Sequence, residues 1–473
     1  MPDLYTPPMP PDEADRARVE HSRLRRRLLT GNWRQDLREF MSREIDAIRL
    51  KSWGEGDVTR NAFRSVVNQL AVLYDRKPII SNDAPGAEEL ADVLDQAGLW
   101  QYARRLLVMT IGMREALYRI AVVDVDGEPS LQIRIVPSDL VYGDSNPDEP
   151  DVPTMITEYR LRQTGRGDNG WEWTKDVLDI RGPEPIYRVL SADGKEDLSG
   201  AFLGVDGGLV GEAYPYRLEG RPCLPYVLYH AERNSDGLFD PYEGSELVEG
   251  SLVASTLWTY WRHVVRDCSH PQRWCVGVRP AGGMVTDRDQ NMAYIPTDPA
   301  SLINFEPTSD LTPSLGQFQP GGDPGALGEA IRAYVADMSL DFGISSTDMA
   351  RVSANPRSGY AIALSREGVR AAQRRSESQS RRGDLETLSK VAAFWNAATG
   401  SNLPESGWRI AYPGMPLSID EKKAMIEEWQ ALAELGVASV VDLYMGVHNV
   451  SREAAITALE RIALERSRYT FTP

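Results

Sequence analysis

Residues 245–267 read SELVEGSLVASTLWTYWRHVVRD, and this stretch predicts one long amphipathic helix. Ser245 can cap the helix, and Glu246 and Glu249 place negative charge in its first turn, where the helix dipole favours it. At 1.5 Å per residue, such a helix spans about 30 Å. Its apolar side chains form one broad stripe, made of Leu247, Val248, Leu252, Val253, Leu257, Trp258, Trp261, Val264 and Val265.

A second helix is predicted from Leu327 to Phe342. The section between the two helices, Gln272 to Pro324, begins and ends near the turn clusters PAGG and PGGDPG, which favour short strands and irregular chain. The sequence therefore predicts two helices joined through a small lobe. The apolar residues of the second helix share one face: Leu327, Ile331, Tyr334, Val335 and Met338.

A third and longer helix is expected from about Ser358 or Tyr360 to Ala398, after a polar loop. The stretch holds no proline, and Gly368 and Gly383 interrupt it. Its end is amphipathic and typical of a core helix. Its middle carries a run of arginines: Arg366, Arg370, Arg374, Arg375, Arg381 and Arg382.

The C-terminal part predicts a small helical lobe. Ser418 and Glu421 form a capping box that opens a helix ending at Gly436. Ser451 caps another helix, which runs to about Arg466.

The N-terminal part begins with a proline-rich stretch, residues 1–12, which we interpret as an extended arm. The segment from Asp15 to Lys51 is rich in helix-forming residues, and further helices are expected at Asn61–Asp75 and Ala87–Gly112. Acidic residues are interspersed elsewhere in the first segment, which also contains an arginine cluster, so we interpret the cluster as a solvated helix face rather than a phosphate-binding patch. The cluster consists of Arg23, Arg25, Arg26 and Arg27.

Residues 118–230 predict a mainly antiparallel β region. Tyr118–Val123 and Leu131–Val136 are β-rich runs joined across Asp126-Gly127, a strong hairpin signal. Further strands are expected in MITEYRLR, WEWTKDVLDI and EPIYRVL, which turn residues separate. Together with the long helices, this region makes the expected fold class α+β.

Length and charge limit the function classes. The 473 residues exceed one ordinary domain, and 52 Lys and Arg against 69 Asp and Glu leave a formal net charge of −17. This charge argues against a protein that coats nucleic acid with a basic surface, but not against one through which nucleic acid passes. Cys223, Cys268 and Cys275 are too few for a disulfide framework, and no apolar run could span a bilayer, so we expect a soluble, non-secreted protein.

Motifs for catalysis are missing from the sequence. We find no phosphate-binding loop, no zinc-protease motif and no nucleophile elbow. Cys268, His270 and Cys275 lie close in sequence but fall short of the four ligands of a structural zinc site, so we interpret them as a strand edge with buried thiols. Asp124 and Asp126 belong to the hairpin turn rather than to a calcium loop. We therefore expect no enzyme, no cofactor and no metal.

Three segments resemble the portal, or head-to-tail connector, proteins of tailed double-stranded DNA bacteriophages. They are PCLPYVLYHAERN followed by GSELVEGSLVASTLWTYWRH, the junction NPRSGYAIALSREG, and the ending MPLSIDEKKAMIEEWQALAELGVASVVDLY. The Ser358-Gly359-Tyr360-Ala361 stretch is similar to the dipeptide and small residues that open the long helix in such portals. The resemblance covers roughly residues 60–470.

The resemblance implies an elongated multi-domain subunit with wing, stem, clip and crown. The divisions it implies are an N-terminal arm (1–12), a wing (13–243), a first stem helix (244–267), a clip (268–325), a second stem helix (326–343), a tunnel loop (344–358), a long wing helix with its connection (359–415) and a short helical crown (416–473).

The resemblance also implies particular residues for two regions. The tunnel loop would face DNA through Ser346, Thr347, Asp348, Arg351, Ser353, Asn355 and Arg357. The stem and its interface would use Leu252, Leu257, Trp258, Trp261, Ile331 and Tyr334. The arginine run in the long helix would form intersubunit ion pairs rather than contact DNA.

The implied function is a non-enzymatic homo-oligomeric ring, expected to have twelve subunits, at one capsid vertex of the virion. Double-stranded DNA would pass through this ring during genome packaging and ejection. The implied partners are the terminase large subunit, head-completion, adaptor or tail proteins, and the major capsid and scaffolding proteins. Assembly would take place in the host cytoplasm, without a membrane. Two alternatives stay open: a metal-dependent hydrolase with dispersed carboxylates, and another virion structural or adaptor protein.

Overall fold

The computed structural model describes residues 7–47, 50–51, 54–163, 170–202, 214–232, 237–240, 246–269, 273–276, 278–280, 286–287, 292–293, 305–307, 312, 314–317, 322–344, 367–414, 419–448 and 452–468. The fold is α+β, as the sequence predicts, and the strand pairs in these ranges are antiparallel. The chain divides into two compact units. The larger unit comprises Met1–Gly31, Phe63–Gly244 and Ser339–Pro473, and the smaller unit comprises Asn32–Ala62 and Ser245–Met338.

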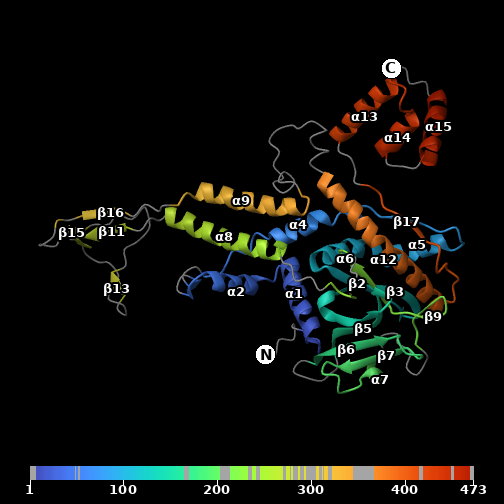
Figure 1. Ribbon diagram of the computed structural model, residues 1–473, viewed down its shortest axis with the longest axis horizontal. Coiled ribbons are helices and arrows are strands. Elements are labelled where there is room, and N and C mark those ends of the chain that lie inside the picture. The colour runs from blue at the N-terminus through green and yellow to red at the C-terminus, as the bar shows by residue number, and fades with distance from the viewer. Residues whose placement is uncertain are drawn as a thin grey trace. The chain divides into compact units, whose positions relative to one another are not determined.

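The smaller unit is built around α8 (Glu246–Ser269), with α2 (Arg34–Glu44) packed against it. The helix α9 (Pro324–Asp341) runs beside α8 in the opposite direction (Figure 1). The chain that connects the two helices forms short antiparallel strand pairs, as expected for a small lobe. They are β11 (Arg273–Val276) with β16 (Ser314–Gln317), β12 (Val278–Pro280) with β15 (Phe305–Pro307), and β13 (Thr286–Asp287) with β14 (Met292–Ala293).

The centre of the larger unit is a three-stranded sheet in the order β10 (Tyr226–His230), β2 (Glu115–Val125), β3 (Glu128–Pro137). Alternate side chains of a strand point to opposite faces of a sheet. Tyr118 and Ile120 of β2 therefore join a core formed with α6 (Leu99–Met113) and α12 (Glu367–Thr399), which pack on the sheet (Figure 1).

The opposite face of this sheet packs on a second, four-stranded sheet. Its order is β4 (Val141–Asn146), β5 (Glu149–Gln163), β6 (Trp171–Asp179), β7 (Ile186–Ser191). Leu117 of β2 contributes to the apolar core between the two sheets, with Ile156 of β5 and Leu178 of β6. The three-stranded sheet is thus a middle layer between helices and a second sheet.

The remaining elements of the larger unit surround these layers. They are α1 (Glu13–Thr30), α4 (Ala62–Leu70), the 3-10 turns η1 (Leu73–Asp75) and η2 (Ser138–Leu140), α5 (Ala87–Gln96), α7 (Ser199–Phe202), the paired strands β1 (Ile79–Ser81) and β17 (Arg409–Ala411), the paired strands β8 (Arg217–Leu218) and β9 (Arg221–Pro222), and the C-terminal helices α13 (Ile419–Glu434), α14 (Val440–His448) and α15 (Arg452–Arg468).

The predicted hairpin forms as expected. Strands β2 and β3 pair from Ala116 to Val125, and the two-residue turn between them is Asp126-Gly127. Asp126 has φ of 56° and Gly127 has φ of 88°, so both turn residues adopt the positive φ that a type I′ turn requires. The Asp124 Oδ1 accepts a hydrogen bond from the Gly127 amide at 2.7 Å, which also fixes the turn.

Several helices are shorter than their patterns suggest, because glycine or a 3-10 turn ends them. Gly31, with φ of 91°, separates α1 from α2, and Gly98, with φ of 67°, separates α5 from α6. The helix expected at Asn61–Asp75 ends at Leu70 and continues as a 3-10 turn. At the C-terminus, α14 is an additional helix that the capping signals did not predict.

The arginine cluster of α1 corrects our sequence interpretation of a solvated face. Arg23 and Arg25 are buried, each 8% exposed. Arg23 lies 4.0 Å from the fully buried carboxylate of Asp139, and Arg26 lies 3.1 Å from it. Burial raises the pKa of Asp139 although both arginines oppose this rise. The reason for the error is that Asp139 is more than 100 residues away in sequence, so local charge spacing could not show it.

The described part of the N-terminal arm packs on the larger unit. Arg23 Nη2 donates to the backbone oxygens of Pro7 and Pro8 at 2.6 and 2.9 Å. The hydroxyl of Tyr159, on β5, donates to the backbone oxygen of Met9 at 3.2 Å. Because proline carries no backbone N–H, the arm is held mainly through its carbonyl groups.

Candidate functional site

The pair α8 and α9 contains the residues that the sequence assigns to the stem. Trp258 and Trp261 pack edge to face, with ring centroids 5.5 Å apart. The indole nitrogen of Trp261 donates to the backbone oxygen of Pro324 at 2.8 Å, so the end of α8 is joined to the start of α9. A Cβ on Gly328 would lie 3.2 Å from that nitrogen, which shows how closely the helices approach.

The other end of the pair is also close. A Cβ on Gly250, near the start of α8, would overlap the sulfur of Met338, near the end of α9. Small residues at both ends therefore let the two helices lie antiparallel at short distance. Each glycine within a helix lowers helix stability by about 1 kcal/mol relative to alanine, and the close packing of the two helices offsets this cost.

Residues 55–60 cover a further side of α8. The guanidinium of Arg60 lies 3.7 Å from the centre of the Trp258 ring, a cation–π contact. Ser255 Oγ donates to the backbone oxygen of Arg60 at 3.1 Å, and the amide of Asp57 donates to Thr259 Oγ1 at 2.8 Å. The helix α8 is therefore enclosed on more than one face, which explains why its serines and threonines are buried as well as its apolar residues.

The predicted stem residues differ in how deeply they are buried. Leu252, Trp258 and Ile331 are at most 5% exposed and hold the helices of one chain together. Leu257 and Trp261 are half-buried. Tyr334 is 38% exposed, and its hydroxyl would lie 3.5 Å from a Cβ on Gly250 of α8. Of the six residues, Tyr334 is the one whose ring is most available to another molecule.

The predicted tunnel-loop residues lie outside the described residues. They are Ser346, Thr347, Asp348, Arg351, Ser353, Asn355 and Arg357. The structure describes the chain on either side, where Gly343 meets Gly368 at the start of α12. A Cβ on Gly368 would overlap the carbonyl oxygen of Gly343, so glycine is required at this first interruption of the long helix.

Two predictions about polar residues can be compared with the structure. In the arginine run of α12, Arg381 pairs with Glu377 at 2.6 Å and Arg382 pairs with Asp151, all within one chain. Cys268 donates through Sγ to the backbone oxygen of Gly322 at 3.4 Å. Among the described residues, no group of His, Cys, Asp and Glu is arranged to hold a metal ion.

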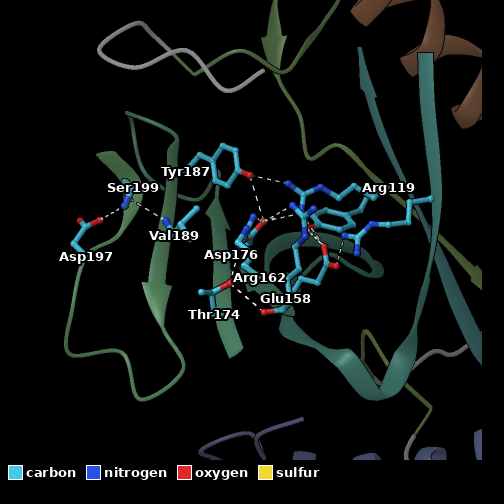
Figure 2. A network of polar contacts seen from close by, with 12 residues as sticks. Arg119, Glu158, Arg162, Thr174, Asp176, Tyr187, Val189, Asp197 and Ser199 are labelled. Carbon is cyan, nitrogen blue, oxygen red and sulfur yellow. Dashed lines mark hydrogen bonds and ion pairs between the residues drawn. The ribbon is translucent and has the colours of Figure 1, made fainter. Parts of the chain in front are cut away.

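A buried charged network lies between the two sheets of the larger unit, and the sequence did not predict it (Figure 2). The register of β5 and β6 places Glu158 directly opposite Asp176. Like charges in this position repel each other. Arg119, from the middle sheet, bridges them: its Nη1 donates to Glu158 at 2.9 Å and to Asp176 at 2.7 Å.

Further groups complete the network. Arg162 donates to Asp176 through both terminal nitrogens, and Arg134 donates to Glu158. The Tyr226 hydroxyl donates to Glu158 at 2.7 Å. Burial by itself would raise the pKa of Glu158, but Arg134 and Arg119 outweigh burial and hold this pKa below its ordinary value.

Arg119 and Arg162 act on the second carboxylate in the same direction and keep the pKa of Asp176 well below its ordinary value despite burial. Both carboxylates are therefore ionised at neutral pH. Because side chains alternate along β2, Arg119 points away from the helices and toward the carboxylates of Glu158 and Asp176. A one-residue shift of register would reverse this placement.

A second buried carboxylate has tyrosines around it. Asp384 of α12 accepts hydrogen bonds from the hydroxyls of Tyr74 at 2.8 Å, Tyr229 at 3.0 Å and Tyr412. Burial raises the pKa of Asp384 from 3.8 to about 6, although the three hydroxyls lower it. Because the tyrosines come from distant segments, the cluster joins α12 to η1, β10 and the chain after β17.

Comparison with known proteins finds similar solved structures but no family. No protein-family model and no curated protein matches the chain. Among the similar solved structures is one titled "Virion of native gene transfer agent (GTA) particle", which aligns over 80% of this chain and 85% of its own, at 13% sequence identity and a TM-score of 0.31. At this TM-score the likeness assigns neither fold nor function. In the part of the chain that the structure describes, no helix is long and apolar enough to cross a lipid bilayer.

Proposed function

We propose that this chain is the subunit of a portal-type ring at a capsid vertex, through which double-stranded DNA is packaged and ejected. In this proposal the protein catalyses no reaction. It would dock the packaging motor and later an adaptor or tail protein. The broader form of the proposal, a structural protein of a virion, requires only the ring and its place in the particle.

The observation that carries the proposal is the antiparallel pair α8 and α9 with its own set of short strand pairs between the two helices. Two long helices that lie side by side and are joined through a small lobe form a unit that identical copies can repeat around an axis. The rods are already packed within one chain through Trp258 and Ile331. Their outer faces are thus available to neighbouring copies.

Exposed apolar residues on α9 support a contact with such a neighbour. Tyr334 is 38% exposed and Leu340 is 54% exposed, whereas Ile331 and Met338 are buried. Tyrosine is among the residues enriched in protein interfaces. In a ring, the ring of one Tyr334 would be covered by the adjacent copy.

The net charge of −17 fits a channel that duplex DNA crosses without being held. DNA carries one negative charge per about 1.7 Å of helix axis, and clustered basic residues would bind it tightly. A predominantly acidic wall repels phosphates and permits sliding. Isolated arginines of the 344–358 segment would then make brief backbone contacts.

The direct test is the size and shape of the purified protein. Analytical ultracentrifugation and negative-stain electron microscopy should show a ring with a central hole and a mass near twelve times the 52.7 kDa of the chain. A monomer or dimer under all assembly conditions would refute the proposal. An activity on a hydrolysable substrate that chelators abolish would favour the alternative of a metal-dependent hydrolase.

A matched pair of variants sharpens this test. Tyr334→Arg places a charge at an exposed position of α9 and should prevent ring formation while the monomer stays folded. Tyr102→Arg makes the same change at a tyrosine of α6 that is 42% exposed, a value close to that of Tyr334. Rings that form equally well with both variants would exclude Tyr334 from the interface.

A further inference from the structure

Residues 237–240, which follow β10 in the chain, are attached to the larger unit through a buried carboxyl group. The backbone amide of Asp240 donates to Oε1 of Glu115, the first residue of β2, and Glu115 is only 1% exposed. The chain enters the smaller unit at Ser245, so this segment is the last described part of the larger unit before α8. We propose that Glu115 forms a pH-sensitive latch on residues 237–240, which is closed while its carboxyl is protonated and opens more often once that group ionises. The inference does not depend on ring formation.

Apolar and cationic contacts attach the same segment to a second element. Leu238 and Phe239 are buried in the apolar core between the two sheets. The guanidinium of Arg18, on α1, lies 4.0 Å from the centre of the Phe239 ring, a cation–π contact. The same guanidinium donates to the backbone oxygens of Ser138 at 3.1 Å and Val141 at 2.7 Å. The segment is therefore attached to α1 as well as to β2.

The residue before Glu115 has a strained backbone. Arg114 has φ of 77°, a value that glycine adopts readily and that is unfavourable for other residues. Its Nε donates to Oδ2 of Asp240 at 3.0 Å, and its Nη2 donates to Glu232 at 3.2 Å. Strain of this kind persists only where surrounding contacts fix it. Opening of the segment removes the contact with Asp240 and allows Arg114 to relax.

The groups around Glu115 determine the pH range of the latch. Burial raises the pKa of Glu115 from 4.5 to about 7, although the Asp240 amide and the charges of Arg18 and Arg114 oppose this rise. His230 lies opposite Glu115 in the strand register, and burial lowers its pKa to about 4, so it stays neutral where Glu115 titrates. Two further carboxyl groups interact with Arg18, and burial raises the pKa of each: Asp15 and Asp139.

Rising pH favours the open form of the latch. In the open form the Glu115 carboxyl meets water and has its ordinary pKa of 4.5, so it loses its proton at lower pH than in the closed form. The closed form therefore loses stability from about pH 4.5 upward, and the loss is complete above about pH 7. With these two pKa values, the ratio of open to closed molecules rises about 70-fold from pH 5 to pH 8.

Hydrogen–deuterium exchange of the full-length protein from pH 5 to pH 8, corrected for the pH dependence of intrinsic exchange, tests the latch. Protection of a peptide covering residues 237–240 should fall about 70-fold over this range. It should also be lower than the protection of β6 at every pH, because the latch opens while the sheet stays folded. A fall of less than about threefold, or equal protection in the two peptides, would overturn the proposal.

The decisive variant is Glu115→Gln, because its side-chain oxygen can still accept the Asp240 amide but the side chain does not ionise. Protection of residues 237–240 in this variant should not depend on pH. The control, Glu232→Gln, removes a carboxylate that is 61% exposed and also contacts Arg114, and it should keep the wild-type pH dependence. A Glu115→Gln profile parallel to that of wild type would assign the effect to other carboxyl groups and refute the latch.

Discussion

Asp384 provides a test of the tyrosine cluster that can be worked out quantitatively. Its carboxyl is buried in the larger unit, and burial raises its pKa from 3.8 to about 6. Among the described residues, its hydrogen-bond donors are the hydroxyls of Tyr74, Tyr229 and Tyr412. Replacing Asp384 by asparagine removes the charge and keeps the size of the side chain.

The pH dependence follows from the direction of this pKa change. Because the pKa is higher in the folded state, the unfolded chain loses its proton first as the pH rises, and the folded state loses stability. The loss begins near pH 3.8 and is complete above about pH 6. The total is roughly 3 kcal/mol at 1.36 kcal/mol per pKa unit, of which about 1.4 kcal/mol falls between pH 5 and pH 8.

Urea denaturation of wild type and Asp384→Asn at pH 5, 6, 7 and 8, followed by tryptophan fluorescence, measures this difference. The free energy of unfolding of the variant should rise relative to wild type by about 1.4 kcal/mol from pH 5 to pH 8. Tyr412→Phe removes one donor to the carboxylate, so it should raise the pKa of Asp384 further and increase the pH dependence. Parallel pH profiles for wild type and Asp384→Asn would refute the reasoning.

Three further changes test the packing described above. Arg119→Met leaves two facing carboxylates without their bridge and should cost about 3–5 kcal/mol of unfolding free energy in urea; adding Asp176→Asn should recover part of it, and a fully additive double variant would contradict the bridging role. Gly383→Ala should cost about 1–3 kcal/mol, because the new Cβ would lie 2.6 Å from the Tyr229 ring; an unchanged melting temperature would argue against this contact. Trp258→Ala should cost about 3–5 kcal/mol and increase hydrogen exchange in α8 and α9, whereas exchange unchanged in both helices would show that the tryptophan does not hold them together.

The sequence predicted the elements whose signals are local. The helix over 245–267 was expected from its capping serine and apolar stripe, and α8 occupies Glu246–Ser269. The hairpin at Asp126-Gly127 was expected from its turn residues, and both adopt positive φ. Such signals act within a few residues, since a helix turn or a two-residue loop is completed by near neighbours. The stem residues and the segment divisions implied by the resemblance stay predictions.

The buried charged network could not be found in this way, because its parts are far apart in the chain. Arg119 lies 39 residues from Glu158 and 57 from Asp176, and no spacing rule connects them. The buried arginines of α1 were misjudged for the same reason. Composition showed only that the chain is acidic overall, which says nothing of where arginines and carboxylates pair in the interior.

The sequence by itself thus determined the long helices, the antiparallel hairpin, the α+β class and the net negative charge. The tertiary structure decided which charges are buried, that Glu158 faces Asp176 across two strands with Arg119 between them, and that three distant tyrosines surround Asp384. The physical reason is that helix and turn signals depend on neighbouring residues, whereas buried ionic contacts depend on strand register and on the packing of one sheet against another.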